Sequence, residues 1–301
     1  MHTVSFTPDW FTNTNYTGLY VAAARGYFAD AGLDVQFLPT PRDHRVAEAV
    51  AAGRSDFGIC YQEQITIIRS ADPPVPVVSI AAIMQHNTTG FLSLASSGIY
   101  RPRDLAGKRY AAIPSATFGA ILGTMMRDDG ADIADVQAMA LGVTDLIPAL
   151  QRGDCDFAWV FAGWEGVDAS RRHLDTNLLR ISDYPAVPDY YTPCLITSEH
   201  TIATQPETVR GFVAAASRGY ADAAKDPEAA ATILIAADPE APADLIRASQ
   251  PYVSPWHQAD APRWGEQSSE RWEALAAFFG AHGLLPRPFD ATVAFTNAFL
   301  P

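Results

Sequence analysis

The feature that most constrains the fold is an alternation of short β-rich runs with helical patterns through the first 200 residues. Strands separated by helices are typical of βαβ units, which build parallel sheets. Ten strands are too many for one doubly wound sheet of this length, so we predict two smaller α/β lobes. The expected strands cover residues 2–8, 33–39, 56–62, 75–83, 91–97, 108–113, 136–141, 156–161, 178–182 and 193–199.

Helical patterns lie between these runs. They are expected near residues 16–31, 43–53, 62–70, 117–129, 144–152 and 164–171. After residue 200 the pattern becomes helical only, with apolar residues three and four positions apart. We expect this tail to pack on the first lobe.

Two polar stretches are expected to carry the chain between the lobes, at residues 84–94 and 189–197. Two extended crossings between two lobes form a hinge. The predicted division is residues 1–87 for the first part of lobe 1, 88–190 for lobe 2, and 191–301 for the return to lobe 1.

Open α/β sheets bind ligands outside the carboxyl ends of their strands. In a protein of two lobes, the loops after the strands would then face one shared cleft. This rule selects the loops TPDWFTNTNY, YQEQ, MQHNTTG, IPSATFG and FAGWEG.

The bulk composition limits the possible partners. A net charge of −13 over 301 residues argues against nucleic acid and anionic membranes, and favours a small molecule. No apolar run approaches the roughly 20 residues of a membrane span. Cys60, Cys155 and Cys194 are widely spaced in apolar runs, so we expect buried thiols and no metal site. No export leader is recognisable, so the chain is either cytoplasmic or the mature form of an exported protein.

The loop TPDWFTNTNYTG, which begins near Asp9, joins the first strand to the first helix. One asparagine would suffice to cap that helix, but two asparagines and Trp10 exceed what a cap requires. Trp10 and Tyr16 offer flat faces with a polar edge, and Asn15 carries both a donor and an acceptor. Such a set suits a planar ring that contains heteroatoms.

The segment Gly163–Gly166 follows a strand that is expected to be buried. Glu165 there could be a first-turn acid that suits the helix dipole. In a cleft it could instead accept hydrogen bonds from an amino-substituted heterocycle or an ammonium group. The neighbouring Trp164 favours the cleft, because aromatic side chains form the walls of pockets.

Two further loops carry weaker signals. Ser115 could bind a polar group at a helix start, or it could cap that helix with Phe118 in the core. His86 and Asn87 lie near a crossing, where a lone histidine is more often structural than catalytic. The motifs GxSxG, HExxH and GxGxxG are absent, so hydrolase, metalloprotease and dehydrogenase functions lose support.

Taken together, these loops resemble the NMT1/THI5-like family of periplasmic-binding-protein-like proteins. The resemblance runs in order through DWFTNTNYTGLYVAAARGYF, GRSDFGICYQEQ, QHNTTGFLSLAS, DLAGKRYAAIPSATFGA, LQRGDCDFAWVFAGWEG and DYYTPCLITSE. It implies a type II periplasmic-binding-protein-like α/β fold, with two lobes, two hinge crossings and a helical tail on lobe 1.

The family contains two functions. One branch comprises transporter binding proteins, some of which carry a thiamine pyrimidine precursor. The other is a single-turnover enzyme that makes the thiamine pyrimidine from pyridoxal phosphate and its own histidine, and it has a lysine and a histidine in GLKAMIH together with a cysteine motif for iron. This chain has Cys60 and Gln64 at those two positions, lacks the cysteine motif, and has no lysine before Lys108. The resemblance therefore implies a binding protein that needs no cofactor, and no enzyme.

The binding-protein branch implies that Asn15 and Tyr16 contact the pyrimidine and that Glu165 binds its amino edge. One departure is Ala162, which replaces the tyrosine of the familiar YGWE. This change enlarges the pocket or shifts stacking to another ring, such as Phe161, Trp164 or Tyr190. A bulkier heterocycle such as a flavin precursor therefore stays an alternative, as does a sulfonate.

We predict a solute-binding protein of an ABC importer that closes by hinge motion on a small aromatic heterocycle. The leading ligand is a thiamine pyrimidine precursor, of the formylaminopyrimidine or hydroxymethylpyrimidine type. The partners would be the transporter permease and ATPase, and the location periplasmic or extracytoplasmic. A pyrimidine-synthase-type enzyme and the sensing domain of a regulator remain rivals. The predicted ligand-binding residues are Asp9, Trp10, Asn15, Tyr16, Tyr61, Gln62, Asn87, Ser115, Phe118, Trp164, Glu165 and Tyr190.

Overall fold

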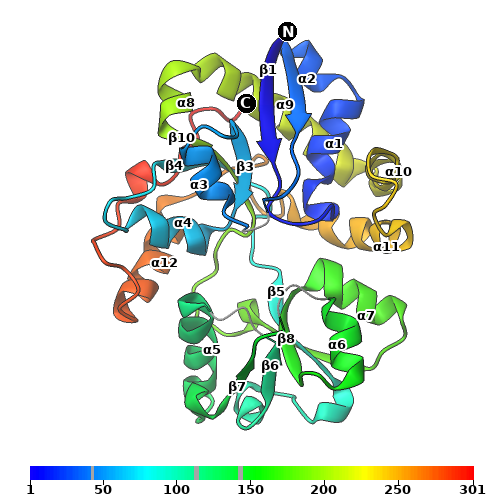
Figure 1. Ribbon diagram of the computed structural model, residues 1–301, viewed down its shortest axis with the longest axis vertical. Helices are drawn as coiled ribbons and strands as arrows, with labels where there is room; N and C mark the ends of the chain where they lie inside the picture. Colours follow the sequence, from blue (N-terminus) through cyan, green and yellow to red (C-terminus); the bar gives the residue numbers. More distant parts are fainter. Residues whose placement is uncertain (42–43, 112–114, 142–144) are drawn as a thin grey trace. The chain divides into compact units, whose positions relative to one another are not determined.

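The computed structural model describes residues 1–41, 44–111, 115–141 and 145–301, which form two compact units (Figure 1). Unit 1 comprises Met1–His86, Tyr190–Ala277 and Leu285–Pro301, and unit 2 comprises Asn87–Asp189 and Phe278–Leu284. Phe278–Leu284 thus groups with unit 2, although the sequence-based division placed it in lobe 1. That the chain forms a hinge between two lobes near residues 87 and 190 stays a prediction.

Unit 1 is built on a five-stranded sheet with the order β2-β1-β3-β10-β4. Its strands are β1 His2–Thr7, β2 Leu33–Phe37, β3 Phe57–Cys60, β4 Val77–Ala82 and β10 Cys194–Ser198. Strand β1 runs parallel to β2 and β3, whereas β10 is antiparallel to both β3 and β4. The sheet is therefore mixed, because the strand on which the chain re-enters unit 1 runs in the opposite direction.

Unit 2 contains a second five-stranded sheet, with the order β7-β6-β8-β5-β9. Its strands are β5 Thr89–Leu94, β6 Arg109–Ala111, β7 Gln137–Met139, β8 Phe157–Phe161 and β9 Thr176–Arg180. Strand β6 is parallel to β7 and β8, and β5 is antiparallel to β8 and β9. All ten predicted strands are present, but each sheet is mixed where the sequence pattern indicated parallel sheets.

The described helices follow the predicted order. They are α1 Thr17–Ala24, α2 Tyr27–Asp30, α3 Val46–Ala51, α4 Gln62–Arg69, α5 Ala116–Asp128, α6 Leu146–Arg152, α7 Val167–Arg171, α8 Glu199–Thr204, α9 Pro206–Lys225, α10 Pro227–Ala237, α11 Ala243–Val253 and α12 Ser269–Ala281. Short helical turns are η1 Thr14–Tyr16, η2 Ala95–Ser97, η3 Pro102–Leu105, η4 Ile133–Asp135, η5 Ala162–Gly166, η6 Ile181–Asp183, η7 Ser254–Trp256 and η8 Ala291–Val293.

The main difference from the predicted helices lies at residues 16–31. This helix is divided into α1 and α2, because Gly26 takes a left-handed conformation with φ of 77°. A residue with a Cβ adopts that region at a cost, so glycine suits the break. Residues 43, 112, 113 and 144, which were predicted to lie in a helix or strand, fall outside the described residues.

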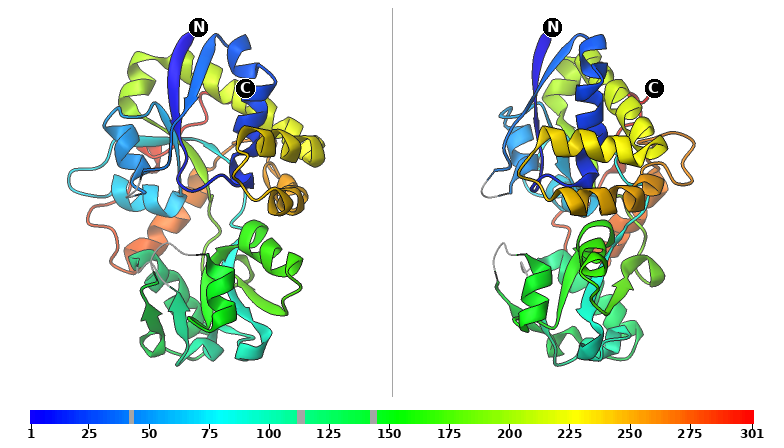
Figure 2. Two further views of the ribbon diagram at one scale, coloured as in Figure 1. Left: turned by 45° about the vertical axis from the view of Figure 1, so that its right-hand side comes forward. Right: turned by 90° about the vertical axis from the view of Figure 1, so that its right-hand side faces the viewer.

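The helical tail packs on unit 1 as the sequence pattern predicted, except for Phe278–Leu284, which groups with unit 2. Helices α1 and α9 lie side by side in both views of Figure 2, and α10 lies beside them. Phe212 of α9 stacks on Phe57 of β3, with ring centroids 3.8 Å apart, and both rings are fully buried. Burial of one such ring contributes about 1.5–3 kcal/mol. The close helix contact needs Gly219, where an added Cβ would lie 1.9 Å from the Gly18 carbonyl oxygen.

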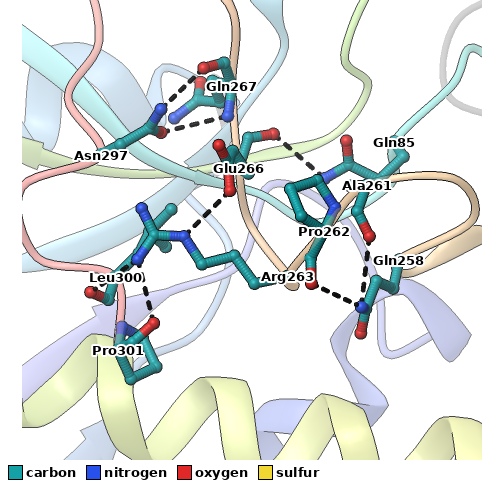
Figure 3. A network of polar contacts seen from close by, with 10 residues as sticks. All are labelled: Gln85, Gln258, Ala261, Pro262, Arg263, Glu266, Gln267, Asn297, Leu300 and Pro301. Atoms are coloured by element: carbon teal, nitrogen blue, oxygen red, sulfur yellow. Dashed lines mark hydrogen bonds and ion pairs between the residues drawn. The ribbon is translucent and has the colours of Figure 1, made fainter.

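The C-terminal segment is hydrogen-bonded to β4 and to the residues near Gln267, and Figure 3 shows the second group of contacts. Ser79 donates its N–H to Ala294, and its carbonyl accepts from Thr296, each at 2.9 Å. The amide of Asn297 donates to the Gln267 carbonyl at 2.7 Å and accepts from its N–H at 3.1 Å. Arg263 donates to the carbonyl of Pro301 at 3.0 Å. These contacts hold residues 291–301 on the edge of the unit 1 sheet.

Candidate ligand-binding site

The loop after β1 places a buried carboxyl group, Asp9, between two tyrosines. Tyr16 donates its hydroxyl to Asp9 Oδ1 at 2.7 Å, and Tyr61 donates to Oδ2. Burial raises the pKa of Asp9, whereas the two tyrosine hydrogen bonds lower it without cancelling the effect. The pKa of Tyr16 lies well above its usual value, because the ring is buried next to this carboxylate. Both tyrosines therefore stay protonated and hold Asp9 in one orientation.

The first helical turn, η1, is fixed by Asn13 and Tyr220. The Asn13 side chain accepts from the Asn15 N–H at 2.9 Å, so Asn13 is the cap that the sequence left open as an alternative. Tyr220 of α9 donates its hydroxyl to the Asn15 carbonyl at 2.7 Å. The Asn15 side chain is half-buried, and no residue in the described ranges forms a hydrogen bond with its amide. Asn15 thus offers a donor and an acceptor on a fixed backbone.

Trp10 lies in the same loop and is half-buried. Its ring packs against the His44 ring with centroids 4.8 Å apart and an angle of 33°. The backbone N–H of Trp10 donates to the Tyr16 hydroxyl at 3.1 Å, and the backbone carbonyl of Trp10 accepts from the Thr40 hydroxyl at 2.8 Å. The backbone of Trp10 is therefore held on both sides, while part of the indole remains exposed.

Three of the predicted ligand-binding residues are almost completely buried. Tyr16 is 1% exposed, and Gln62 and Tyr190 are 0% exposed. The Gln62 side chain accepts from the Tyr191 N–H at 2.7 Å and donates to the Arg271 carbonyl at 3.2 Å. Gln62 therefore joins α4 to the segment before β10 and to α12, and Tyr16 orients Asp9. That any of the three touches a ligand stays a prediction.

β3 ends at Cys60, and only Tyr61 separates it from α4. The Cys60 thiol is buried and donates to the Gln64 side-chain oxygen at 3.2 Å. The resemblance predicts that the enzyme's lysine and histidine correspond to Cys60 and Gln64, and in this chain these two side chains bind each other. Tyr61 is half-buried and reaches Asp9.

Glu63 is a candidate that the sequence analysis missed. Its Oε2 atom is buried, and none of the described residues forms a hydrogen bond with it. Burial, with a smaller contribution from the charge of Asp9, raises the pKa of Glu63 to about 8. The sequence signal that could have found Glu63 is an acidic residue in the first turn of the YQEQ helix. This signal is weak, because an acid at that position also suits the helix dipole.

Glu165 is the corresponding carboxyl in unit 2. It lies in η5, a single π-helical turn directly after β8, and such turns are frequent at functional sites. Its Oε2 accepts from the Phe161 N–H at 3.0 Å. Burial raises the pKa of Glu165 to about 7, with smaller contributions from Asp145 and Asp168. Glu165 and its neighbour Trp164 are both half-buried, so part of each is accessible.

An aromatic cluster lies on one face of the unit 2 sheet. Trp159 of β8 is opposite Phe91 of β5 in the strand register, and their ring centroids are 5.6 Å apart. Phe118 of α5 stacks on Tyr110 at 3.9 Å and lies 6.5 Å from Trp159. Trp159 is half-buried, so it is the accessible ring of this cluster. The sequence analysis missed Trp159, although the alternation of Phe157, Trp159 and Phe161 could have found it.

The remaining predicted residues have local partners. Ser115 caps α5 by accepting from the Phe118 N–H at 3.1 Å, so the structure contains the cap that the sequence left open. Phe118 itself is 8% exposed. Asn87 is buried, and its Oδ1 accepts from both the N–H and the hydroxyl of Thr89 at 2.7 Å. His86 pairs with Asp260 at 2.8 Å.

Three other observations bear on function. Within the described ranges, no group of three or more His, Cys, Asp or Glu side chains is placed to hold a metal ion. The Lys108 ammonium donates to the Ser97 carbonyl at 2.7 Å in unit 2. None of the helices in the described part of the chain has the length and apolar character of a membrane span.

Comparison with protein families decides the relationship. Residues 13–230 match the family described as NMT1/THI5 like. The chain belongs to the NMT1/THI5-like family. The resemblance inferred from the loop motifs is therefore confirmed.

Curated relatives extend over nearly the whole chain. A formylaminopyrimidine-binding protein of Halalkalibacterium halodurans is 28% identical over 99% of this chain and 90% of its own length. A 4-amino-5-hydroxymethyl-2-methylpyrimidine phosphate synthase of Legionella pneumophila is 26% identical, over 97% and 90% respectively. The riboflavin-binding protein RibY of Chloroflexus aurantiacus is 26% identical over 99% of this chain and 86% of its own. The chain is thus similar to binding proteins and to a synthase of the same family.

Solved structures confirm the fold class. The alkanesulfonate-binding protein SsuA of Xanthomonas axonopodis pv. citri, bound to MOPS, superposes with a TM-score of 0.71 at 14% identity. The match covers 98% of each chain. This protein therefore has the solute-binding, periplasmic-binding-protein-like fold that the sequence predicted, and at this identity the likeness concerns the fold alone.

Proposed function

We propose that this protein binds a small nitrogen heterocycle, a thiamine pyrimidine precursor of the formylaminopyrimidine or hydroxymethylpyrimidine type. The observation that carries the proposal is Glu165, a half-buried carboxyl that directly follows the strand bearing Trp159. A carboxylate in such surroundings accepts strong hydrogen bonds from an amino group. The half-exposed tryptophan on the same strand offers a face on which a planar ring can stack.

Unit 1 carries a second set of groups that would suit such a ligand. Asn15 carries an amide without an internal partner among the described residues, and Trp10 offers part of its indole. Donor, acceptor and flat surface match the edges and faces of an aminopyrimidine. Hinge closure around the ligand stays part of the proposal.

A role as a pyrimidine synthase is the weaker candidate. The Legionella relative has that activity, but here Cys60 and Gln64 stand at the positions of its family's lysine and histidine. Their side chains bind each other at 3.2 Å, and burial keeps the pKa of the Cys60 thiol well above its usual value. No residue at this turn can form an imine with pyridoxal phosphate.

Other solutes are the second alternative. The relative named as a riboflavin-binding protein and the smaller Ala162 both favour a bulkier ring. A sulfonate is opposed by the carboxyl groups of Asp9 and Glu165 in their ionised form, because a buried anion next to a carboxylate is strongly unfavourable.

We further propose that the protein works outside the cytoplasmic membrane with the permease and ATPase of an ABC importer. The solute-binding fold supports this assignment. Co-purification of the three components, with and without the pyrimidine, tests it. Absence of a ligand-dependent complex in a reconstituted transporter would contradict it.

A thermal-unfolding screen tests the ligand class. A ligand at a hundred times its Kd stabilises a protein by roughly 2.7 kcal/mol. We expect stabilisation by aminopyrimidines, and none by pyridoxal phosphate or alkanesulfonates. Stabilisation by riboflavin and by no aminopyrimidine would contradict the proposal and favour a flavin precursor as the ligand. An imine absorbance band with pyridoxal phosphate would favour the enzyme.

A further inference from the structure

The helical turn η1 is joined to the C-terminal helix α11 by a buried pair of hydroxyl groups. The Thr14 hydroxyl oxygen lies 2.6 Å from that of Ser249, and both side chains are at most 1% exposed. Thr14 directly precedes Asn15, whose backbone is also held by Asn13 and Tyr220. The hydroxyl pair therefore fixes the turn from the side of α11, one residue before the candidate ligand contact.

A second connection joins the first residue of α1 to the same helix. The Thr17 hydroxyl donates to Gln250 Oε1 at 2.6 Å, and the Gln250 amide donates to the Ser254 hydroxyl at 3.1 Å. Ser254 in turn donates to the Ala223 carbonyl of α9 at 2.9 Å. A helical carbonyl accepts from the residue four positions on, which here is Pro227 and has no N–H. The chain of hydrogen bonds thus ends on a carbonyl to which the next turn offers no donor.

Both connections lie within unit 1 and consist of neutral groups. Thr17, Ser249 and Gln250 are all fully buried. Helix α11 contacts η1, and both views of Figure 2 show it beside the start of α1. A buried polar network whose members have partners fixes one arrangement of the elements that it joins, because any other arrangement leaves a buried polar group unpaired. The network therefore specifies how α11 meets the turn.

Helix α11 lies beyond the part of the chain that matches the family model. The match ends at residue 230, and α11 begins at Ala243. We propose that Ser249 and Gln250 are positioning residues for ligand binding, because they hold the turn that carries Asn15. This inference rests on the proposed function, from which it takes Asn15 as a ligand contact. It assigns a role in binding to a helix that offers no ligand contact of its own.

Preorganisation is the physical reason why such residues affect affinity. A ligand that meets a turn already held in its binding conformation does not have to order it. Ordering on binding costs roughly 2- to 12-fold in affinity for each immobilised side chain. Loss of Ser249 or Gln250 should therefore weaken binding, although neither side chain touches the ligand.

Isothermal titration of the full chain with 4-amino-5-hydroxymethyl-2-methylpyrimidine tests the proposal. Thr14→Val keeps the shape of the side chain without its hydroxyl, whereas Thr14→Ser keeps the hydroxyl. We expect Thr14→Val, Ser249→Ala and Gln250→Met each to weaken binding about 3- to 10-fold, and Thr14→Ser to retain most of the affinity. Thr14→Val combined with Ser249→Ala should cost about as much as the larger single change, because both remove one contact.

Thr201→Val is the matched control. The Thr201 hydroxyl pairs with the Ser198 hydroxyl at 2.8 Å, and both side chains are buried in unit 1. This pair lies at the edge of the sheet opposite to η1, because β10 runs antiparallel to β3 (Figure 1). We expect Thr201→Val and Thr14→Val to lower the unfolding temperature by a similar amount, roughly 2–4 °C. Only Thr14→Val should change the affinity, which separates positioning from a loss of stability.

Hydrogen exchange in the empty protein tests the positioning without a ligand. The Asn15 and Tyr16 N–H groups bond to Asn13 within the turn. We expect both to exchange faster in Ser249→Ala and Gln250→Met than in the wild type, and at the wild-type rate in Thr201→Val.

Two results would overturn the inference and leave the proposed function intact. One is unchanged exchange in η1, and the other is unchanged affinity in both Ser249→Ala and Gln250→Met. Failure of the wild type to bind the pyrimidine would instead overturn the proposed function. Faster exchange confined to η1 would in that case still support the positioning of the turn by α11.

Discussion

The hydroxyl of Tyr16 donates to Asp9 Oδ1 at 2.7 Å and also accepts the Trp10 N–H at 3.1 Å. One buried oxygen thereby fixes a carboxyl and the backbone of an aromatic residue in the same loop. Because the ring is 1% exposed, its role in the empty protein is to position these two neighbours.

Tyr16→Phe removes both hydrogen bonds without changing the shape of the ring. We expect a loss of about 1–3 kcal/mol in the free energy of unfolding, since a buried carboxyl oxygen and a backbone N–H lose their partner. Chemical denaturation measures this loss. Tyr100→Phe is the control, because Tyr100 is 67% exposed and its substitution should change stability by less than about 0.5 kcal/mol. Equal stabilities of the two variants would contradict the positioning role.

Alanine substitutions of two helical glycines, Gly219 and Gly119, are expected to change stability in opposite directions. Gly219→Ala places a Cβ 1.9 Å from the Gly18 carbonyl oxygen and should separate α1 from α9, at a cost of roughly 1–3 kcal/mol or more. Because Tyr220 follows it and holds the Asn15 carbonyl, ligand affinity should fall as well. Gly119→Ala in α5 meets no atom within 4 Å and should stabilise the protein by about 0.5–1 kcal/mol. Unfolding midpoints of the two variants that shift in the same direction would refute this packing.

Glu165 makes stability depend on pH. Its pKa is about 7 in the folded protein and close to 4.5 in the unfolded chain, so the folded state binds more protons between these values. The contribution of Glu165 to the stability of the folded state is therefore fully present below pH 4.5. It is lost as the pH rises through 7. The upper limit of this contribution is roughly 3 kcal/mol, because each unit of pKa shift corresponds to about 1.4 kcal/mol. Solvent access to the half-buried carboxyl makes the contribution smaller.

Glu165→Gln keeps the neutral form at every pH. We expect the difference in unfolding temperature between the variant and the wild type to move in favour of the variant from pH 5 to pH 8. Scanning calorimetry at several pH values measures it. A difference that stays constant over this range would show that the pKa of Glu165 is not raised.

Trp159→Ala tests the stacking surface of unit 2. Stacking of a heterocycle on an aromatic side chain is worth about 1–3 kcal/mol, so the affinity for an aminopyrimidine should fall by roughly 5- to 150-fold. Tyr100→Ala removes an exposed aromatic ring from the same unit and serves as the control. Unaltered affinity in Trp159→Ala would exclude this ring from the site.

The sequence predicted the strands well because each is a short apolar run bounded by polar or glycine-rich turns. It missed the antiparallel direction of β10 and β5, because direction depends on which strands become neighbours, and no local pattern carries that information. It also predicted one helix over 16–31, where Gly26 with a left-handed conformation ends α1.

The candidate site shows the same limit at the level of side chains. The loop motif identified Asp9, Trp10 and Asn15, but it could not tell that Tyr16 is buried beneath them. The sequence did not identify Glu63, because the burial of its oxygen without a hydrogen-bond partner depends on how the folded chain packs. Trp159 was interpreted as part of a buried strand, since the alternation of faces along β8 shows which ring stays accessible only once the sheet is known.

Isothermal titration of the wild type and Glu165→Gln with formylaminopyrimidine tests the central claim most directly. The account predicts binding of one ligand per chain to the wild type. It also predicts at least a tenfold loss of affinity in the variant, because a charge-assisted hydrogen bond contributes about 1.5–3 kcal/mol. Equal affinity in both proteins, or binding of riboflavin with no binding of the pyrimidine, would contradict it.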